Sequence, residues 1–240
     1  VTEDANSSLK GTGGLIASGN LTLAGANTFT GGVQINGGTT YLNNPTALGT
    51  GTLTLNGGNI DTSTTSQITA NNNPVTINAN FTFAGGTNNA LNMGTGAVGL
   101  GTASGTTRTI NVNNAGKLTL GGIISDGTTA NSITKANSGT LVLSGANAYT
   151  GATSLTGGTL TLTNGSALGA NVVGNNVTIS ANTTFNYAAS ANAPLNIGGN
   201  MAITAGTTTI GTSIGSAPTS AMLNVAGNAT ISNAAHRINI

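Results

Sequence analysis

Cysteine and tryptophan are absent from this sequence, and charged and aromatic side chains are rare. Only 4% of the residues are charged and 3% are aromatic, against about 25% charged residues in an ordinary soluble domain. Disordered chains combine low hydrophobicity with high net charge. This chain is 37% hydrophobic with a net charge of +1, so we exclude that class. The lack of cysteine fits an exported bacterial protein.

The scarcity of charge and of apolar runs also excludes two kinds of partner. The basic residues are scattered along the chain, at Lys10, Arg108, Lys117, Lys135 and Arg237. Nucleic-acid binding depends on clusters of such side chains, so we expect no nucleic-acid partner. The longest apolar run has about four residues, whereas a transmembrane helix needs about 20. We therefore expect no membrane span in this chain.

The start of the sequence and its charge suggest two further expectations. No initiator methionine or charged-then-apolar leader is present, so we expect a mature product or a segment of a larger protein. A net charge near zero gives little electrostatic protection against self-association.

Glycine, threonine and asparagine take the place of charged residues in this composition. The chain has 38 glycines, 44 threonines and 35 asparagines, together roughly half of its 240 residues. Enough leucine, isoleucine and valine remain to build a core. The surface is therefore expected to consist mainly of uncharged hydrogen-bonding groups.

The sequence repeats itself internally. Residues 19–49 and 139–169 share 16 identities in 31 aligned positions, including Gly-Ala-Asn, an aromatic residue and Thr-Gly. A second pair of blocks, 73–83 and 175–185, is related by a shift of 102 instead of 120. The second copy therefore lacks a short strand-turn-strand near 51–67. We divide the chain into a lead-in (1–18), a first repeat unit (19–138) and a shorter second unit (139–240) of one elongated domain.

Short alternating segments indicate strands throughout. Apolar residues recur at every second position, as in Val75–Ile77, Leu160–Leu162 and Val177–Ile179, which is the period of a β-strand. Glycine, asparagine or serine bounds each segment, as turns require. No stretch has the spacing of a stable helix.

Two all-β folds compete for this pattern. In an antiparallel β-sandwich, the Asn-Gly pairs at 36–37, 56–57 and 164–165 would form hairpin turns. In a parallel β-solenoid, strands stack in register about 4.8 Å apart, so that charged ladders repel while asparagine and threonine ladders form hydrogen bonds. The repeats and the lack of charge favour the solenoid, with about a dozen coils of roughly 20 residues stacked along its axis.

The repeated segments resemble a known family. "GTLVLSGANAYTGATSLTGGTLTL" (139–162) and "GNLTLAGANTFTGGVQINGG" (19–38) are similar to the autotransporter-associated β-strand repeat, or passenger-associated transport repeat. "GGIISDG" and "ITKANSGTL", between 121 and 141, resemble its usual lead-in, although Asn137-Ser138 replaces the more usual Gly-Ala-like pair. The two core motifs cover about a quarter of the chain.

The resemblance implies a right-handed parallel β-helix in a large secreted or surface-displayed bacterial passenger. In such proteins the repeat is thought to help the passenger fold as it leaves the cell. A C-terminal membrane barrel and an effector domain, which the family leads us to expect, are not recognisable here. The resemblance thus implies a fragment, or a repeat protein that assembles by another route.

The sequence offers little for catalysis. Glycoside hydrolysis needs two carboxylates about 5–10 Å apart, and the only acidic residues are Glu3, Asp4, Asp61 and Asp126. We expect Glu3 and Asp4 to be a solvated terminal pair, and Asp126 to accept backbone hydrogen bonds in a turn. His236, the single histidine, has no neighbouring partner for a metal site or a triad. We therefore expect no catalytic residue, no metal ligand and no cofactor site.

Phe29 and Tyr149 occupy the same position of the repeat. Their recurrence in a chain with so few aromatic residues indicates packing at a coil corner, with stacking against a sugar as the alternative.

The sequence therefore predicts a non-enzymatic structural protein of the bacterial exterior. We expect a solenoid stalk or subunit whose end coils stack head-to-tail into a homopolymeric filament. The alternative is a passenger segment that acts as an adhesin and binds surface glycans. A polysaccharide-degrading enzyme is disfavoured by the shortage of carboxylates.

Overall fold

The computed structural model describes residues 1–64, 66–86, 89–180, 182–188, 193–204, 208–212, 223–232 and 237–239. Within these ranges it contains 26 strands and no helix. Every described pair of neighbouring strands is parallel, for example β1 with β3, β2 with β4 and β13 with β16. The chain is therefore a parallel β-solenoid, and the antiparallel β-sandwich is wrong.

The strands form three long sheets and one short one. The ten-stranded sheet contains β2 (Leu21–Leu23), β4 (Thr39–Leu42), β6 (Asn59–Asp61), β9 (Phe81–Phe83), β12 (Thr107–Val112), β15 (Ser132–Ala136), β17 (Thr153–Leu155), β19 (Val177–Ile179), β22 (Met201–Ile203) and β25 (Ala229–Ile231). The eight-stranded sheet contains β7 (Ser66–Ile68), β10 (Ala90–Asn92), β13 (Lys117–Leu120), β16 (Thr140–Leu143), β18 (Thr159–Leu162), β20 (Thr183–Tyr187), β23 (Thr208–Thr212) and β26 (Arg237–Asn239).

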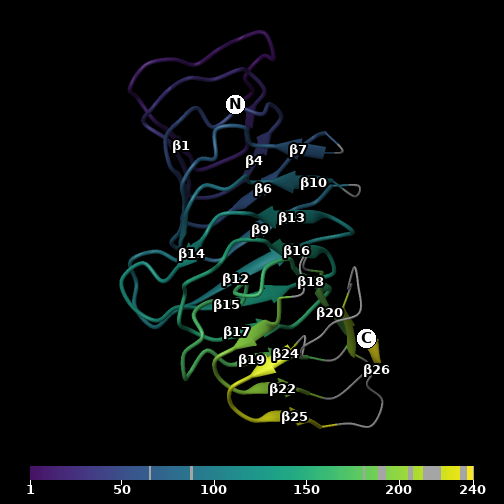
Figure 1. Ribbon diagram of the computed structural model, residues 1–240. Coiled ribbons are helices and arrows are strands. Elements are labelled where there is room, and N and C mark those ends of the chain that lie inside the picture. The colour runs from purple at the N-terminus through teal and green to yellow at the C-terminus, as the bar shows by residue number, and fades with distance from the viewer. Residues whose placement is uncertain are drawn as a thin grey trace.

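The six-stranded sheet contains β1 (Leu15–Ala17), β3 (Val33–Ile35), β5 (Leu53–Leu55), β8 (Val75–Ile77), β11 (Val98–Gly99) and β14 (Ile124–Ser125). A two-stranded sheet of β21 (Leu195–Ile197) and β24 (Leu223–Val225) takes the same point in the coil near the C-terminus. A full coil visits the six-stranded, ten-stranded and eight-stranded sheets in that order, and the coils stack from the N-terminal to the C-terminal end (Figure 1).

The core is a set of apolar columns that run along the axis. In the eight-stranded sheet, Leu118, Leu141, Leu160 and Phe185 are register partners on successive strands, and all four are buried. Each such side chain contributes roughly 1.5–3 kcal/mol by leaving water. The intervening positions face outward, which explains the period-two pattern of the sequence.

Asparagine ladders form at the corners, as expected from the composition. The Asn56 amide donates to Oδ1 of Asn36 at 2.9 Å, and the Asn78 amide donates to Oδ1 of Asn56 at 2.9 Å. If charged residues of one sign replaced these asparagines, each would lie one coil from another like charge and would repel it. The Asn-Gly pairs at 36–37 and 56–57 are thus corners of coils and not hairpin turns.

Within the described ranges the coils are fewer and less uniform than predicted. The longest sheet has ten strands, whereas the sequence predicted about a dozen coils. In this sheet Leu21 is the register partner of Thr40, whereas Phe81 is the register partner of Ile110, so the second of these two coils is much longer than the first. Where the turns between strands are longer, each coil contains more residues, and the same length of chain forms fewer coils.

Candidate functional site

The asparagine of each repeated Gly-Ala-Asn motif ties three coils together. Oδ1 of Asn147 accepts a hydrogen bond from the Ile124 backbone N–H at 2.8 Å, and its amide donates to the Ala167 carbonyl at 2.6 Å. Asn27 makes the same pair of bonds, to Leu9 at 2.7 Å and to Ala47 at 2.9 Å. Both side chains are buried. The most recognisable part of the repeat is therefore used for coil-to-coil bonding.

The repeated aromatic residue lies in the core. Phe29 and Tyr149 are 2% and 0% exposed, so neither ring presents a face to a sugar. The Tyr149 hydroxyl bonds to Oγ1 of Thr153 at 2.7 Å. Burial raises the pKa of Tyr149 well above its ordinary value. The packing interpretation is confirmed, and stacking of a sugar on either ring is wrong.

Two of the four carboxylates support the repeat loops. Asp126 accepts hydrogen bonds from the Asn131 N–H at 2.9 Å, the Thr150 N–H at 3.0 Å and the Thr150 hydroxyl at 2.6 Å, which confirms its turn role. Glu3 was expected to be solvated, but its Oε2 accepts from the Gly25 N–H and the Asn27 amide, each at 3.0 Å. The first coil of the solenoid places Glu3 against the loop that contains Gly25 and Asn27. These residues are far apart in the sequence, so the sequence alone did not indicate the contact.

The remaining candidates are not brought together. Asp4 lies in an exposed turn and accepts from the Asn6 N–H at 2.8 Å, and buried Asp61 accepts from the Thr62 N–H at 2.8 Å. No group of three or more His, Cys, Asp or Glu residues that could hold a metal ion occurs in the described ranges. His236 lies outside the described residues.

Among the side chains that the structure describes, two cations are buried, which the sequence analysis missed. The Lys135 ammonium donates to the carbonyls of Ala136, Asn137 and Gly157 at 2.8, 2.7 and 3.0 Å, and burial lowers the pKa of Lys135 to about 8. Arg108 Nε donates to the Ile77 and Leu100 carbonyls at 2.9 and 3.0 Å, and burial also lowers its pKa.

A signal for this burial existed in the sequence. Lys135 lies two residues after the inward Ile133, and Arg108 lies two residues before the inward Ile110. Residues two apart on a strand face the same side, so the period-two pattern points both side chains into the core. Backbone carbonyls take the place of acidic partners at both sites.

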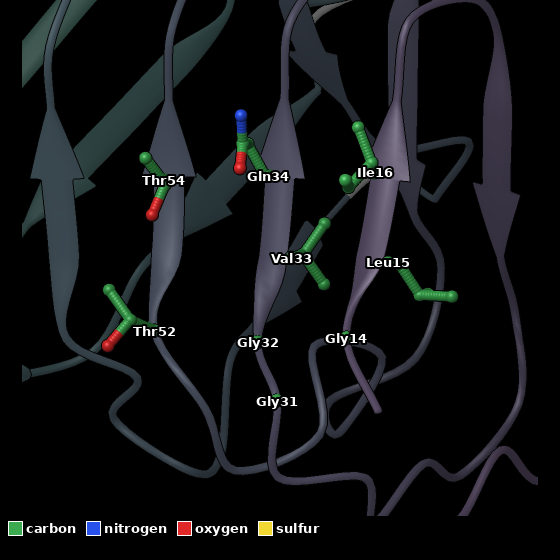
Figure 2. A pocket seen from close by; sticks show the side chains of 9 residues that line it. All are labelled: Gly14, Leu15, Ile16, Gly31, Gly32, Val33, Gln34, Thr52 and Thr54. Carbon is green, nitrogen blue, oxygen red and sulfur yellow. The ribbon is translucent and has the colours of Figure 1, made fainter. Parts of the chain in front are cut away.

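The outer side of the first strands of the six-stranded sheet carries a shallow groove of about 310 Å³. Figure 2 shows Ile16, Gln34 and Thr54 side by side on neighbouring strands, with Gly31 and Gly32 at the start of β3. The nine lining residues include no titratable side chain. The groove can offer hydrogen bonds and the 71% exposed Ile16, but its lining has no group to move a proton.

Comparison with known proteins agrees with this architecture. The passenger-associated-transport-repeat family model matches residues 18–40 and 133–162, which are the segments that contain the buried asparagine and aromatic residues. The chain therefore carries passenger-associated transport repeats in a β-solenoid, a kind of repeat that occurs in autotransporter passengers. No curated protein and no solved structure matched the chain. No helix in the described ranges is long and apolar enough to cross a membrane.

Proposed function

We propose that this chain is a non-enzymatic, length-building segment of a protein on the bacterial exterior, where its coils form a stalk. The observation that carries this proposal is the use of the repeated residues. Asn27, Asn147, Phe29 and Tyr149 are all buried between coils, so repetition of the motif extends the rod. The repeat family supports a secreted or surface location, because such repeats occur in autotransporter passengers.

Export and extension can be tested in one experiment. The chain is placed as the passenger of a bacterial autotransporter, either as it stands or with residues 51–121 duplicated. This segment contains β5 to β13, which are three complete coils, so the duplication keeps every later strand on its own face and adds roughly 14 Å at about 4.8 Å per strand. We expect both proteins to reach the surface, and small-angle scattering of the released passenger to show this increase. Retention in the cell, or an unchanged maximum dimension, would contradict the stalk.

We also propose that copies associate head-to-tail through their end coils. The last strand of the ten-stranded sheet, β25, carries Ile231 at 51% exposure, and β1 at the other end of the molecule carries the exposed Ile16. Unpaired parallel edges accept further strands, and a contact between different ends makes open filaments. Electron microscopy of the purified chain should show filaments that Ile231→Lys shortens. Uniform monomers at high concentration would refute this association.

Adhesion remains the alternative, since the groove in Figure 2 offers uncharged hydrogen-bonding groups to a glycan. A glycan array with the Gln34→Ala variant as control would test it, and binding that does not depend on Gln34 would argue against this groove.

A further inference from the structure

The outer side of the eight-stranded sheet carries two straight columns of small side chains over the strands β13, β16, β18 and β20. Register pairs Lys117 with Thr140, Thr159 and Thr184 in one column, and Thr119 with Val142, Thr161 and Asn186 in the other. Figure 1 shows β13, β16 and β18 stacked one below another. Except for exposed Lys117, these side chains are half-buried, because their neighbours cover part of each one. The result is a regular surface of hydroxyl and methyl groups.

The hydroxyl groups of this face have no hydrogen-bond partner among the described residues. Within the part of the chain that the structure describes, none of the side chains of Thr119, Thr140, Thr159, Thr161 and Thr184 takes part in a hydrogen bond. The corner residues behave in the opposite way, since Asn56 and its neighbours bond to each other along the axis. The face therefore keeps its hydrogen-bonding capacity for something outside the chain.

The spacing of the face is fixed in two directions. Successive strands lie about 4.8 Å apart, and side chains two residues apart on a strand lie roughly 6.6 Å apart. The inward Leu141, Leu143, Leu160 and Leu162 are at most 1% exposed, so the core holds the strands in place. The hydroxyls thus form a regular array.

We propose that this face binds ice, through its neutral array of threonine hydroxyl and methyl groups. A lattice of ordered water is uncharged and offers donors and acceptors at regular spacing, which matches a face whose one charge, Lys117, lies at its edge. Holding a liquid water molecule costs up to about 2 kcal/mol of entropy, whereas water in ice is already ordered. The face has no aromatic side chain on which a sugar could stack. This inference depends only on the face and is independent of the stalk role.

The test is the uptake of purified, fluorescently labelled chain into a slowly growing ice hemisphere. We expect the wild-type chain to enter the ice and Thr161→Lys, in the middle of the array, to lose this uptake. Thr178→Lys is the matched control, because Thr178 is a half-buried outward threonine on β19 of the ten-stranded sheet, between Ser154 and Ala202. That variant should enter ice as the wild type does.

A second variant guards against misfolding. Thr140→Lys changes the neighbouring rung, and circular dichroism reports whether each variant keeps its β-structure. Loss of uptake in a folded Thr140→Lys or Thr161→Lys chain, with Thr178→Lys unaffected, supports the proposal. Exclusion of the wild-type chain from ice overturns it, and so does an equal loss in all three variants. Association of two copies through this face, without uptake, also overturns it.

Discussion

At the scale of single residues, stability depends on buried polar groups that join one coil to the next. Asn27 and Asn147 each satisfy a backbone N–H of the preceding coil and a carbonyl of the following one. Lys135 satisfies three carbonyls. Buried polar groups contribute little net energy when paired but are expensive to leave unpaired, so these positions should be sensitive to substitution.

Asn147→Ala is expected to destabilise the chain strongly. The substitution leaves the Ile124 N–H and the Ala167 carbonyl without their partner, at about 1–3 kcal/mol each. Urea unfolding should show the loss. The matched control is Asn171→Ala, since Asn171 is exposed and exposed positions usually change stability by less than about 0.5 kcal/mol. Similar losses for the two variants would contradict the role given to Asn147.

Lys135 should make stability rise with pH in the alkaline range. The pKa of Lys135 is about 8 in the fold, against 10.5 for an ordinary lysine. Between these values the unfolded chain binds more protons than the folded one, so the free energy of unfolding rises with pH. Below pH 8 the lysine is charged in both states and contributes no pH dependence.

Tyr149 opposes this rise at higher pH. Its pKa is raised by burial from 10.0, so only the unfolded chain loses this proton as the pH passes 10, and stability then falls. The effect of Lys135 on stability can therefore be measured without that of Tyr149 between pH 8 and pH 10. Urea unfolding in that window should show a positive slope that Lys135→Met removes. An identical slope in both proteins would show that Lys135 is not the group responsible.

At the scale of elements, the repeat loop packs on the strand that follows it, and the two copies do so with different chemistry. Tyr149 bonds to Thr153 on β17, while the equivalent positions in the first copy are Phe29 and Val33, both 2% exposed. A buried hydroxyl pair in one copy is thus an apolar pair in the other. The loop residue and the strand residue must therefore match each other, as two hydroxyl groups or as two apolar groups, but neither has to be one particular residue.

This difference predicts strong coupling between Tyr149 and Thr153. Tyr149→Phe and Thr153→Val each leave one buried hydroxyl without its partner, with an expected loss of about 1–3 kcal/mol. The double variant recreates the Phe29–Val33 pair and should unfold at nearly the wild-type urea concentration. A double-mutant cycle measures this recovery, and simple addition of the two losses would refute the pairing.

At the scale of the whole molecule, the two copies of the repeat lie on different faces of the solenoid. The strands β2, β3 and β4 belong to the ten-, six- and ten-stranded sheets, whereas their equivalents β16, β17 and β18 belong to the eight-, ten- and eight-stranded sheets. The repeat loop replaces an eight-stranded-sheet strand in the first copy and a six-stranded-sheet strand in the second. The shift between the copies therefore turns the motif by one face as well as moving it along the axis.

The segment missing from the second copy amounts to one complete coil. The shift between equivalent positions falls from 120 to 102 across this segment, and a deletion of 51–68 accounts for the difference. That stretch contains β5, β6 and β7, one strand of each long sheet. The prediction of a missing strand-turn-strand was therefore too small. Only removal of a whole coil leaves every later strand on its own face and its apolar residues inward.

Deletion of residues 51–68 should consequently be tolerated. It brings Leu42 and Val75 to the same separation along the chain as Leu162 and Val177 have in the second copy. We expect native-like circular dichroism and a single sharp unfolding transition. Deletion of residues 51–59 is the matched control, because removal of half a coil moves the following strands to other faces. A stable fold in the control, or collapse of the whole-coil deletion, would contradict this account.

The sequence alone determined the all-β class, and it favoured the parallel solenoid over the antiparallel β-sandwich. These follow from local facts, namely period-two alternation, turn residues and recurrence, which short stretches of the chain already display. The alternation of Leu160 and Leu162 also places both side chains on one face of their strand, and both are buried. The alternation that points Lys135 and Arg108 inward was also present in the sequence, but the sequence analysis missed it.

Only the tertiary structure decided which residues meet across coils. Coil length varies within the ten-stranded sheet, as the register pairs Leu21–Thr40 and Phe81–Ile110 show, so no constant period locates the neighbour of a given side chain. The contact of Glu3 with Asn27, the carbonyls around Lys135 and the threonine array of the eight-stranded sheet all depend on this register. Register is set by how many residues each turn takes before the next apolar pair faces inward, and that is a property of the assembled coil.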